Sequence, residues 1–593
     1  MSEKKYSFVK TSYRVMSIQL KAAAGYTFIS CVLSIIHALA WVYSVIVSKN
    51  LFDAAAAAST GQIGFTQCLV PLLILACVTF GQQIINGVSN FFWYFLDGKA
   101  GGKIRTLLHL KLTRINPACF EDTTFLDDLN KAKEGIKIVP IYCTAILGVI
   151  FFYGVYFISI GVYFFYLKPI LLITLLLSFL PALLGQIVRA KVFTKLEQES
   201  APLRRENEYY RKALCDREYF KETRTLGAFG FFYRMFSDTL RLLMEKSWRA
   251  ERKTALLELL LGTSTFAGMA VSAYLLFTAV ISGEISVGTF AAVFAALKDV
   301  FAIMKEIITG HIGAINRDIG KLVNFIRLLD MPERKGANEK PDFSKGVAAE
   351  TISFTYPGRE ERAVKDVSLT IADNETIAIV GENGAGKSTL VRLLTGLYCP
   401  SQGRVIAGGR DTAQTSPAAL YAGMSGVFQK FQRYKMTLKE NVILSDTETA
   451  PVDSGIVSVL KEAGMEIEPG LDLETMLSPE FDGIDLSGGQ WQRLAIGRGL
   501  YRRSGFIVLD EPTAAIDPIE ETRIYRQFQR LAKGKCAVVV THRLGSAKLA
   551  NRIIVMDNGK IVDTGTHEEL LSRPGKYADM WKAQAQWYER EEC

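Results

Sequence analysis

The chain has 593 residues, of which 49% are hydrophobic and 22% are charged, and its formal net charge is +9. This length is enough for about three or four domains of average size. The mean hydropathy is positive, which argues against a protein that is soluble throughout its length. A positive charge is also found in nucleic-acid-binding proteins, but the positions of the charges favour an explanation from membrane topology.

The apolar residues are concentrated in the first half of the chain. Long apolar runs such as LVPLLILACVTFG and AILGVIFFYGVYFISIGVYFFYL occur there, whereas the C-terminal part has the composition of a soluble α/β domain. We therefore expect a membrane domain followed by a soluble domain. The expected boundaries are an N-terminal segment at 1–21, a membrane domain at 22–330, a linker at 331–346, a soluble domain at 347–585 and a tail at 586–593.

Six apolar segments are each long enough to cross about 30 Å of hydrocarbon as a helix of about 20 residues. The loops FYLKP and SGEIS are short and lie on one side of the membrane, so the long connections 96–138 and 191–254 lie on the other. We therefore predict a polytopic α-helical membrane domain with six transmembrane helices and long helical extensions. The segments are placed at 22–47, 68–95, 139–164, 170–190, 255–281 and 287–311.

Lysine and arginine are concentrated on the side of the long connections. The opposite side has few basic residues beyond Lys49 and Lys168. By the positive-inside rule, both termini, both long connections and the soluble domain are expected in the cytoplasm, with the chain crossing the inner (plasma) membrane of the cell several times. The lipid bilayer is thus an expected partner, and nucleic acid is not. The basic residues behind this argument are Lys4, Lys5, Lys10, Arg14, Lys21, Lys99, Lys103, Arg105, Lys111, Arg114, Lys131, Lys133 and Lys137.

Two other patterns are interpreted as ordinary structure. The stretch DAAAAAST, after the first apolar segment, resembles the end of a signal peptide, but the apolar run before it is longer than a signal core of about 7–15 residues. We therefore expect a helix that continues past the lipid surface. The nine cysteines form no C-x-x-C pair and no cluster with histidine, which indicates small apolar side chains rather than a metal site or disulfides.

The middle of each long connection, at 116–132 and 213–229, is a predicted docking surface. Connections of this length can form two helices that reach about 25–30 Å from the membrane, at about 1.5 Å per residue. Phenylalanine is mixed with charged residues at both places, as at Phe120 and Phe220. This mixture favours a short transverse helix that contacts another domain, rather than a turn that is merely solvated.

Polar side chains within apolar helices are costly, so each marks a candidate functional position. Two explanations stay open, a water-filled cavity that lines a substrate path and a set of hydrogen bonds or ion pairs within the bundle. For His37 in the first segment we favour packing, and the pair Lys305-Glu306 lies nearer the cytoplasmic end of the sixth. The candidate cavity residues are Gln82, Asn86, Asn90, Lys298 and Asp299.

In the soluble domain, ETIAIVGENGAGKSTLVRLL reads as a strand, a glycine-rich loop and a helix, which is the context that a P-loop requires. Its glycines let the backbone fold around phosphate oxygens, Lys387 is placed to reach the β- and γ-phosphates, and the Ser388 hydroxyl is placed on Mg²⁺. ATP and Mg²⁺ are therefore the expected ligands. The candidate ATP-binding residues here are Gly381, Glu382, Asn383, Gly384, Ala385, Gly386, Lys387, Ser388 and Thr389.

Further stretches place reactive side chains at strand ends. GFIVLDEPTAAID predicts a buried strand parallel to and beside the P-loop strand, with Asp510 near the metal and Glu511 placed to polarise a water that attacks the γ-phosphate. His542, at the end of another apolar strand, is a candidate to hold that water in line, and Gln429 in GVFQKF is a candidate ligand of metal or water. Tyr356, in FTYPG, is a candidate to stack on adenine. The candidate catalytic residues are Glu511, His542 and Gln429, and the candidate Mg²⁺ ligands are Ser388, Gln429 and Asp510.

The stretch IDLSGGQWQRLAIGR, at 484–498, is a second helix start that attracts phosphate, because a Ser-Gly-Gly turn with free N–H groups runs into a basic helix. The motifs and their order along the chain resemble those of an ABC transporter ATPase domain. These motifs are Walker A, Q-loop, signature, Walker B with its glutamate, D-loop and H-loop, preceded by an aromatic A-loop. They are Gly381–Thr389, Gln429, Leu486–Gln490, Phe506–Glu511, Asp517, His542 and Tyr356. With six apolar segments in front, the chain resembles a half-transporter of the exporter-type (type IV) ABC fold. This implies an ATP hydrolase built on an α/β P-loop NTPase domain with an α-helical subdomain.

In this family the signature turn contacts the ATP that is held in the P-loop of the partner domain. The resemblance therefore implies that two chains enclose two ATP molecules with two-fold symmetry. The intact core motifs favour a second copy of the same chain as partner, with a paralogous half-transporter as the alternative. The residues implied to bind ATP in trans are Ser487, Gly488, Gly489, Gln490 and Asp517.

The departures from the family pattern are few. AAID stands where SALD is commoner but keeps Asp517, DNETIAIVG lacks a glycine before the P-loop strand, and PEFDGIDLSGG replaces VGExGxxLSGG with Glu480 left to contact the partner's helices. Together with Trp491, this last change resembles lantibiotic and other bacterial peptide exporters. No peptidase domain precedes the first segment, so leader cleavage is not expected.

The resemblance also implies a two-state transport cycle. ATP binding draws the two soluble domains together, the segments 116–132 and 213–229 move the membrane helices, and the cavity changes from cytoplasmic to outward access. Hydrolysis with Glu511 as base resets the cycle. Export of a small peptide is the leading expectation, with multidrug or lipid export and siderophore-type import as alternatives. The absence of a regulatory insertion disfavours an ATP-gated channel, and the six apolar segments disfavour a non-membrane ABC ATPase.

Overall fold

The computed structural model describes residues 6–467, 470–511, 528–529 and 532–589. Contacts within the chain divide it into two compact units. The helical unit contains the residues up to Leu110 together with Asp127–Asp330, and the α/β unit contains Lys111–Leu126 together with the residues from Met331 onward. The connection between the second and third apolar segments therefore contributes to both units.

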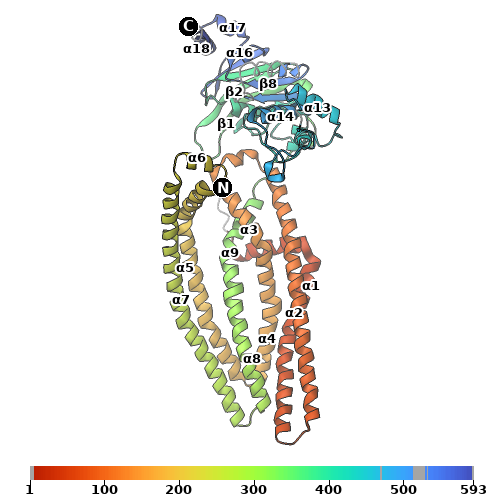
Figure 1. Ribbon diagram of the computed structural model, residues 1–593, viewed down its shortest axis with the longest axis vertical. Helices are drawn as coiled ribbons and strands as arrows, with labels where there is room; N and C mark the ends of the chain where they lie inside the picture. Colours follow the sequence, from red (N-terminus) through yellow and green to blue (C-terminus); the bar gives the residue numbers. More distant parts are fainter. Residues whose placement is uncertain (1–5, 468–469, 512–527, 530–531, 590–593) are drawn as a thin grey trace. The chain divides into compact units, whose positions relative to one another are not determined.

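The helical unit is built from long helices (Figure 1). Among the described residues, six helical stretches are long and apolar enough to cross a membrane, which confirms the prediction of six such segments. Two of the stretches contain a π-helical turn, at Val149–Gly154 and at Ile307–Ile312. The helices are α1 (Phe8–Ser59), α2 (Phe65–Arg114), α3 (Thr123–Gly148), α4 (Val155–Leu167), α5 (Pro169–Cys215), α6 (Phe220–Thr225), α7 (Phe229–Ile281), α8 (Val287–Glu306) and α9 (Gly313–Leu329).

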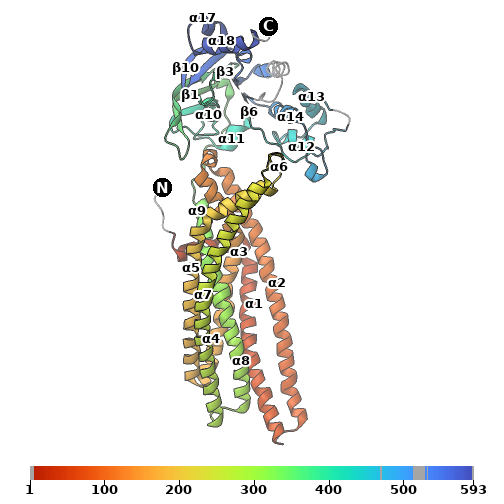
Figure 2. The same cartoon turned by 60° about the vertical axis from the view of Figure 1, so that its left-hand side comes forward.

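These helices extend well beyond the apolar segments that predict them. Helix α1 has 52 residues and α7 has 53, whereas about 20 residues are enough to cross the hydrocarbon. Their polar ends continue as helix because Lys, Arg, Glu, Leu and Ala are good helix formers. Helix α5 lies beside α7 along much of its length in both views (Figure 1, Figure 2), and α1 packs against α8.

Each of the two predicted docking segments contains a short helix. The first holds a five-residue 3₁₀ turn, η1 (Pro117–Glu121), and the second holds the six-residue α6. Helix α3 begins directly after η1, because the Asp122 carboxylate accepts a hydrogen bond from the Thr124 backbone N–H at 2.8 Å and so favours a new helix start. The rest of 213–229 is divided between α5, α7 and the turns that flank α6.

The α/β unit contains two sheets. The first has the order β2-β1-β4-β5 and is antiparallel, and the second has the order β10-β9-β3-β8-β7-β6, in which β9, β3, β8, β7 and β6 run parallel. The inner parallel strands are apolar and buried, as is usual for parallel sheets. The strands are β1 (Val347–Thr355), β2 (Arg362–Ile371), β3 (Thr376–Gly381), β4 (Gln402–Ala407), β5 (Arg410–Asp411), β6 (Met424–Val427), β7 (Phe506–Asp510), β8 (Cys536–Val540), β9 (Arg552–Asp557) and β10 (Lys560–Gly565).

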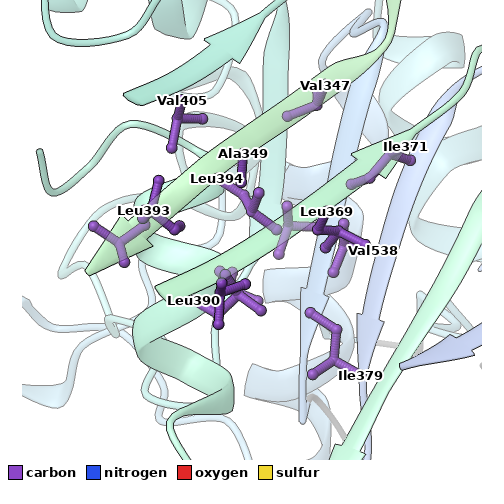
Figure 3. Close-up of a cluster of buried hydrophobic side chains, with 14 of the residues drawn as sticks. Val347, Ala349, Leu369, Ile371, Ile379, Leu390, Leu393, Leu394, Val405 and Val538 are labelled. Carbon is purple, nitrogen blue, oxygen red and sulfur yellow. The ribbon is translucent and has the colours of Figure 1, made fainter. Parts of the chain in front are cut away.

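Helix α10 (Lys387–Leu394) packs against both sheets and forms the centre of the core of the α/β unit (Figure 3). Its Leu390, Leu393 and Leu394 are fully buried among side chains from both sheets, such as Leu369 and Val538. Burial of each such leucine stabilises the fold by about 1.5–3 kcal/mol. This packing fixes the first turn of α10 at the ends of the parallel strands.

Three helices form a second, smaller core, which corresponds to the predicted α-helical subdomain. Leu438, Leu460 and Leu494 are fully buried there, and Trp491 is 1% exposed. The helices of the subdomain are α12 (Leu438–Ile443), α13 (Asp453–Glu462) and α14 (Gly488–Tyr501). The remaining described helices of the α/β unit are α11 (Pro417–Ala422), α16 (Leu544–Ala547), α17 (His567–Ser572) and α18 (Lys576–Glu589).

Candidate functional site

The loop between β3 and α10 has a backbone that only glycine adopts easily. Gly381 and Gly386 have φ angles of +152° and +95°. A Cβ atom on Gly381 would lie 2.3 Å from the Met556 carbonyl oxygen, and one on Gly386 would lie 2.6 Å from the Ala363 carbonyl oxygen. Any larger residue would therefore meet fixed backbone as well as an unfavourable φ. The loop leaves its backbone N–H groups available at the start of α10, which is a geometry that binds phosphate.

Lys387 is the first residue of α10 and is folded back into this loop. Its Nζ atom donates hydrogen bonds to the carbonyl oxygens of Gly381, at 2.9 Å, and Glu382, at 3.0 Å. The side chain is 5% exposed, and burial lowers its pKa, against the opposing effect of the nearby carboxylates. The ammonium group is thus held in place by neutral carbonyl oxygens, next to the loop that would cradle the phosphates.

Ser388 and Asp510, two of the three predicted Mg²⁺ ligands, lie next to each other. The Ser388 Oγ atom donates to Asp510 Oδ1 at 3.2 Å. Asp510 is 4% exposed, and burial together with the charge of Glu511 raises its pKa. Hydroxyl, carboxylate and amide oxygens are the ligands that Mg²⁺ prefers, so Ser388, Asp510 and the Gln429 side chain fit this ion.

The strand order corrects one prediction about Asp510. Strand β7, which ends at Asp510, does not lie beside the P-loop strand β3, because β8 lies between them. In the register of the sheet, Asp510 pairs with Val540 of β8, and Val540 pairs with Ile379 of β3. The Ser388 hydroxyl nevertheless reaches Asp510, since α10 begins over the ends of these strands. Both groups lie at the same edge of the sheet, so they meet although β3 and β7 are not paired with each other.

Both carboxylate oxygens of Glu511 have a nitrogen partner. Gln429 Nε2 donates to Oε2 at 2.9 Å, and His542 Nε2 lies 2.5 Å from Oε1. Glu511 is 9% exposed and has a φ of +46°, a conformation that costs a non-glycine residue about 1–2 kcal/mol. Its backbone N–H donates to the Val540 carbonyl at 3.1 Å, which holds this strained position. Two of the predicted catalytic side chains, Gln429 and His542, thus directly contact the third, Glu511.

A cavity of about 570 Å³ connects these groups within the α/β unit. Three of the predicted site residues, Gly381, Glu382 and Asp510, are not among its described lining residues. Gly381 holds Lys387 through its carbonyl, the Glu382 carboxylate pairs with Lys576 at 3.3 Å, and Asp510 contacts the lining residue Ser388. The predicted residues that line the cavity are Tyr356, Asn383, Gly384, Ala385, Gly386, Lys387, Ser388, Thr389, Gln429, Glu511 and His542. Their convergence gives one site with room for a nucleotide.

The cavity is also lined by residues that the sequence analysis did not identify. Arg359, Arg362 and Lys365 add positive charge near Tyr356, and Asn558 follows β9. The three cations lie shortly after Tyr356 in the chain, so their spacing was a usable signal. Glu121 also lines the cavity, but it comes from η1, more than two hundred residues earlier, and nothing in the local sequence connects the two.

Tyr356, the predicted adenine-stacking residue, is connected to Glu121 of η1 by hydrogen bonds through Arg392 and Tyr398. The Tyr356 hydroxyl lies 2.9 Å from Thr389 Oγ1, and Arg392 NH1 donates to it at 3.2 Å. Arg392 NH1 also donates to Tyr398, and the Tyr398 hydroxyl donates to Glu121 Oε1 at 2.5 Å. The network therefore links η1 to the edge of the nucleotide cavity.

The signature turn lies outside this cavity. None of Ser487, Gly488, Gly489 and Gln490 is among the described lining residues. Ser487 caps α14 reciprocally with Gln490: its Oγ accepts from Gln490 N at 3.2 Å, and its backbone N–H donates to Gln490 Oε1 at 2.9 Å. Gly488 is exposed, and a Cβ atom placed on it would meet nothing within 4 Å. Asp517, the fifth residue implied to act in trans, lies outside the described residues.

Two side chains hold the signature helix in place. Trp491 Nε1 donates to Asp485 Oδ1 at 3.1 Å, just before the turn. Arg498 donates to the carbonyl oxygens of Gln432, at 2.7 Å, and Asn441, at 2.9 Å, and burial lowers its pKa to about 10. Since Gln432 follows Gln429 closely in the chain, Arg498 fixes α14 to the segment that carries a catalytic candidate. Sequence reasoning missed this residue, because an arginine within an amphipathic helix gives no specific signal.

A second cavity, of about 390 Å³, lies within the helical unit. Of the candidate cavity residues, Asn86 and Asn90 line it, whereas Gln82, Lys298 and Asp299 are not among its described lining residues. His37, for which packing was favoured, lines the cavity and also accepts a hydrogen bond from Trp41 Nε1 at 3.1 Å. The lining residues are Ser34, His37, Trp41, Asn86, Ser89, Asn90, Trp93, Thr144, Gly148, Phe152, Tyr153, Ile303, Glu306 and His311. We call this space the membrane cavity.

Comparison with known families agrees with both units. Residues 27–301 match the family described as the ABC transporter transmembrane region, and residues 364–514 match the family described as ABC transporter. Together the matched residues make up well over half of the chain. The predicted resemblance is therefore supported independently in the helical unit and in the α/β unit.

Individual relatives extend this likeness. The subtilin transport ATP-binding protein of Bacillus subtilis is 28% identical over 521 residues, which cover 85% of this chain and 83% of that protein. The nisin transport ATP-binding protein of Lactococcus lactis subsp. lactis is 36% identical over 235 residues, 39% of either chain. The ATP-dependent lipid A-core flippase of Haemophilus ducreyi is 32% identical over 327 residues, 54% of this chain and 55% of that protein. The alignments thus span most of the first relative and about half or less of the other two.

A solved structure has the same fold over nearly the whole chain. It is described as a bacterial Atm1-family ABC exporter with ATP bound, and it matches with a TM-score of 0.81 over 95% of this chain and 99% of that chain. The sequence identity is 20%, so this match establishes the fold alone.

Proposed function

We propose that this chain, which belongs to the ABC transporter family and carries both its transmembrane region and its ATPase domain, works as a dimer that uses ATP to export a small peptide. One observation carries the proposal of a dimer. The signature turn, Ser487–Gln490, is capped, exposed at Ser487 and Gly488, and outside the described lining of the nucleotide cavity of its own chain. A helix start with free N–H groups and no ligand from its own chain is suited to the nucleotide of a second chain.

The residues of the nucleotide cavity support a direct hydrolysis mechanism. Lys387 and the loop N–H groups bind the phosphates. Oxygens of Ser388, Asp510 and Gln429 would hold Mg²⁺, which when bound would neutralise phosphate charge. Glu511 accepts the proton of the attacking water on a carboxylate oxygen, while the terminal phosphoryl group passes to the water oxygen and its bond to the β-phosphate oxygen breaks to release ADP.

The contacts of Glu511 support its role as the base. Gln429 and His542 hold its two oxygens at 2.9 Å and 2.5 Å, so the carboxylate has one orientation before the nucleotide arrives. Such preorganisation lowers the cost of reaching the transition state. Because His542 and Gln429 come from different loops, the base is positioned only when those loops are in place.

The peptide cargo is supported by the similarity to the subtilin transport protein, which extends over most of both chains. Lipid export is the second candidate, because lipid A-core flippases are similar over about half of this chain. The coupling of ATP use to cargo movement follows the alternating-access scheme, in which nucleotide binding favours one of two conformations.

We also propose that the chain lies in the inner (plasma) membrane with both termini and the ATPase domain in the cytoplasm. The basic residues of the long connections support this orientation through the positive-inside rule. The short loops share one side of the helical unit, as Lys168 of the first pairs with Glu284 of the second at 2.9 Å.

Transport into liposomes tests the proposal. The purified protein is reconstituted, ATP is added to the side of the ATPase domain, and uptake of labelled nisin and subtilin is compared with flipping of labelled lipid A. We expect ATP-dependent peptide uptake that Glu511→Gln abolishes. Lipid A flipping without peptide uptake would replace the peptide proposal by the lipid one, and ATP-independent movement of both would contradict the transport mechanism.

A further inference from the structure

We propose that the membrane cavity binds an ammonium group carried on an apolar body, and so selects positively charged cargo. This inference rests on the proposed transport function and names the chemistry that its cargo must have. The cavity lies within the helical unit, and both π-helical turns of that unit contribute to it: Tyr153 comes from the first and His311 from the second. Such turns interrupt regular helix packing and often occur at functional sites.

The charge of the lining favours a cation. Among the described lining residues, Glu306 is the one carboxylate, and none is a lysine or arginine. Within the described part of the chain, no ion pair includes Glu306. A carboxylate in a membrane-spanning helix is costly unless a positive partner offsets it, and at low dielectric its attraction for a nearby cation is strong. An anionic ligand would leave this charge opposed by like charge.

A second carboxylate lies behind the wall of the cavity. Thr144 lines the cavity, and its hydroxyl donates to Asp97 Oδ1 at 3.0 Å. The hydrogen bond turns the Thr144 oxygen lone pairs away from Asp97, so they remain available as acceptors. Asp97 thus adds negative potential without occupying the space, which strengthens the preference for a cation.

The aromatic lining supplies the apolar part of the site. The indole N–H groups already have partners in the protein: Trp41 Nε1 donates to His37 at 3.1 Å, and Trp93 Nε1 donates to Ser34 Oγ at 3.3 Å. What these indoles offer a ligand is therefore aromatic surface, and aromatic rings attract ammonium groups through their negative faces. This surface distinguishes the site from a simple ion site.

Glu306 is held close to the aromatic lining by its neighbours. The Tyr153 hydroxyl lies 2.9 Å from His311 Nε2 and also interacts with Glu306. Since a tyrosine hydroxyl has a single proton, it donates to one of these groups at a time. An ammonium group that binds Glu306 would release this hydroxyl to His311, so ligand binding and local hydrogen bonding are coupled.

The cation has two sources that the same chemistry fits, a lysine-bearing peptide and a small organic cation. Stimulation of ATP hydrolysis in dodecyl maltoside separates them. The probes are a short leucine- and alanine-rich peptide with two lysines, the same peptide with both lysines acetylated, and tetraphenylphosphonium. We expect the free-lysine peptide to act at a concentration about tenfold lower than the acetylated one. Equal action of both peptides would overturn the cation site while leaving peptide transport intact.

Substitutions assign the effect to the membrane cavity. Glu306→Gln removes the charge at nearly constant shape and is expected to abolish the difference between the two peptides, whereas Glu306→Asp keeps the charge and preserves a difference. Asp299→Asn, on the same helix but outside the cavity lining, is expected to keep the wild-type difference. A Glu306→Gln protein that still prefers the free-lysine peptide would contradict the proposal, as would a loss of preference in Asp299→Asn alone. Action of tetraphenylphosphonium without either peptide would support the cation site but overturn peptide cargo.

Discussion

The nucleotide cavity and the membrane cavity bind charge in opposite ways. The first, of about 570 Å³, is lined by Lys387, Arg359 and Arg362 and by the N–H groups of a glycine-rich loop. The second, of about 390 Å³, is lined by a carboxylate, two indoles and neutral polar groups. The first cavity holds the phosphates with Lys387 and the loop N–H groups and places carboxylates, Glu511 among them, elsewhere in its lining. The second offers one described carboxylate within an aromatic wall. The same chain therefore separates its energy source from its proposed cargo by the sign of their charge.

The two cavities also differ in how rigidly their residues are held. In the nucleotide cavity, Lys387 and Ser388 begin α10 after the glycine-rich loop that follows β3, and Glu511 directly follows β7, so main-chain geometry fixes all three. In the membrane cavity, single side chains come from different helices and two π-helical turns. We expect substitutions of these fixed residues in the first cavity to abolish activity, and substitutions in the second cavity to change the concentration at which cargo acts.

The largest effect is expected for Glu511→Gln. The amide cannot accept the proton of the attacking water, so turnover should fall by about 10²–10⁴-fold, the usual contribution of a general base. ATP binding should remain, because Lys387 and the P-loop are unchanged. Single-turnover hydrolysis and equilibrium binding of labelled ATP measure the two separately. Retained hydrolysis would mean that another group is the base.

The next largest effect is expected for Gly381→Ala. The added Cβ would meet the Met556 carbonyl at 2.3 Å in a backbone with φ of +152°, so the loop must shift and ATP affinity should be lost. Binding of labelled ATP, with thermal unfolding as a control for folding, measures this. Gly488→Ala is the matched control for folding, since its Cβ meets nothing within 4 Å. Normal ATP affinity in Gly381→Ala would contradict the described loop.

A smaller effect is expected for Tyr356→Ala. Loss of an aromatic contact costs about 0.5–1.5 kcal/mol, so the dissociation constant for ATP should rise by about three- to tenfold. Tyr356→Phe keeps the ring and loses the hydroxyl contacts with Thr389 and Arg392. It should bind ATP almost normally, and equal weakening in both variants would assign the effect to the hydroxyl network instead of stacking.

The smallest effect is expected in the membrane cavity, for Trp41→Ala. A cation–aromatic contact at a site that water reaches contributes about 0.5–1 kcal/mol, which predicts a rise of about two- to fivefold in the concentration of lysine peptide that stimulates hydrolysis. Trp41→Phe keeps an aromatic face and should change this concentration less. An equal change in the two variants, both of which lose the indole N–H bond to His37, would show that this hydrogen bond matters more than the ring.

The nucleotide site could be predicted from sequence to a large extent, and the reason is physical. The P-loop, Asp510, Glu511 and His542 are each next to a short apolar strand, and parallel strands bring their ends to one edge. The order of the strands could not be predicted, so β8 was missed between β3 and β7. Glu121 was missed because it reaches the cavity from a distant segment of the chain.

The membrane cavity could be predicted only in part. Asn86 and Asn90 stand out as polar residues in an apolar helix, and they line it. Lys298 and Asp299 stand out equally, but which face of a helix meets a cavity depends on packing against its neighbours, which the pattern of one helix does not specify. Tyr153 and His311 lie in π-helical turns, whose positions no motif in the sequence marks.

The central claim is that each nucleotide is bound by the P-loop of one chain and the signature turn of another. Its most direct test combines two inactive variants, Lys387→Ala and Gly488→Glu, with different affinity tags. Each variant alone should hydrolyse no ATP. The doubly purified mixed dimer should hydrolyse ATP, because one of its sites joins an intact P-loop to an intact signature turn. A mixed dimer as inactive as its parents, beside an active doubly tagged wild-type dimer, would contradict the account.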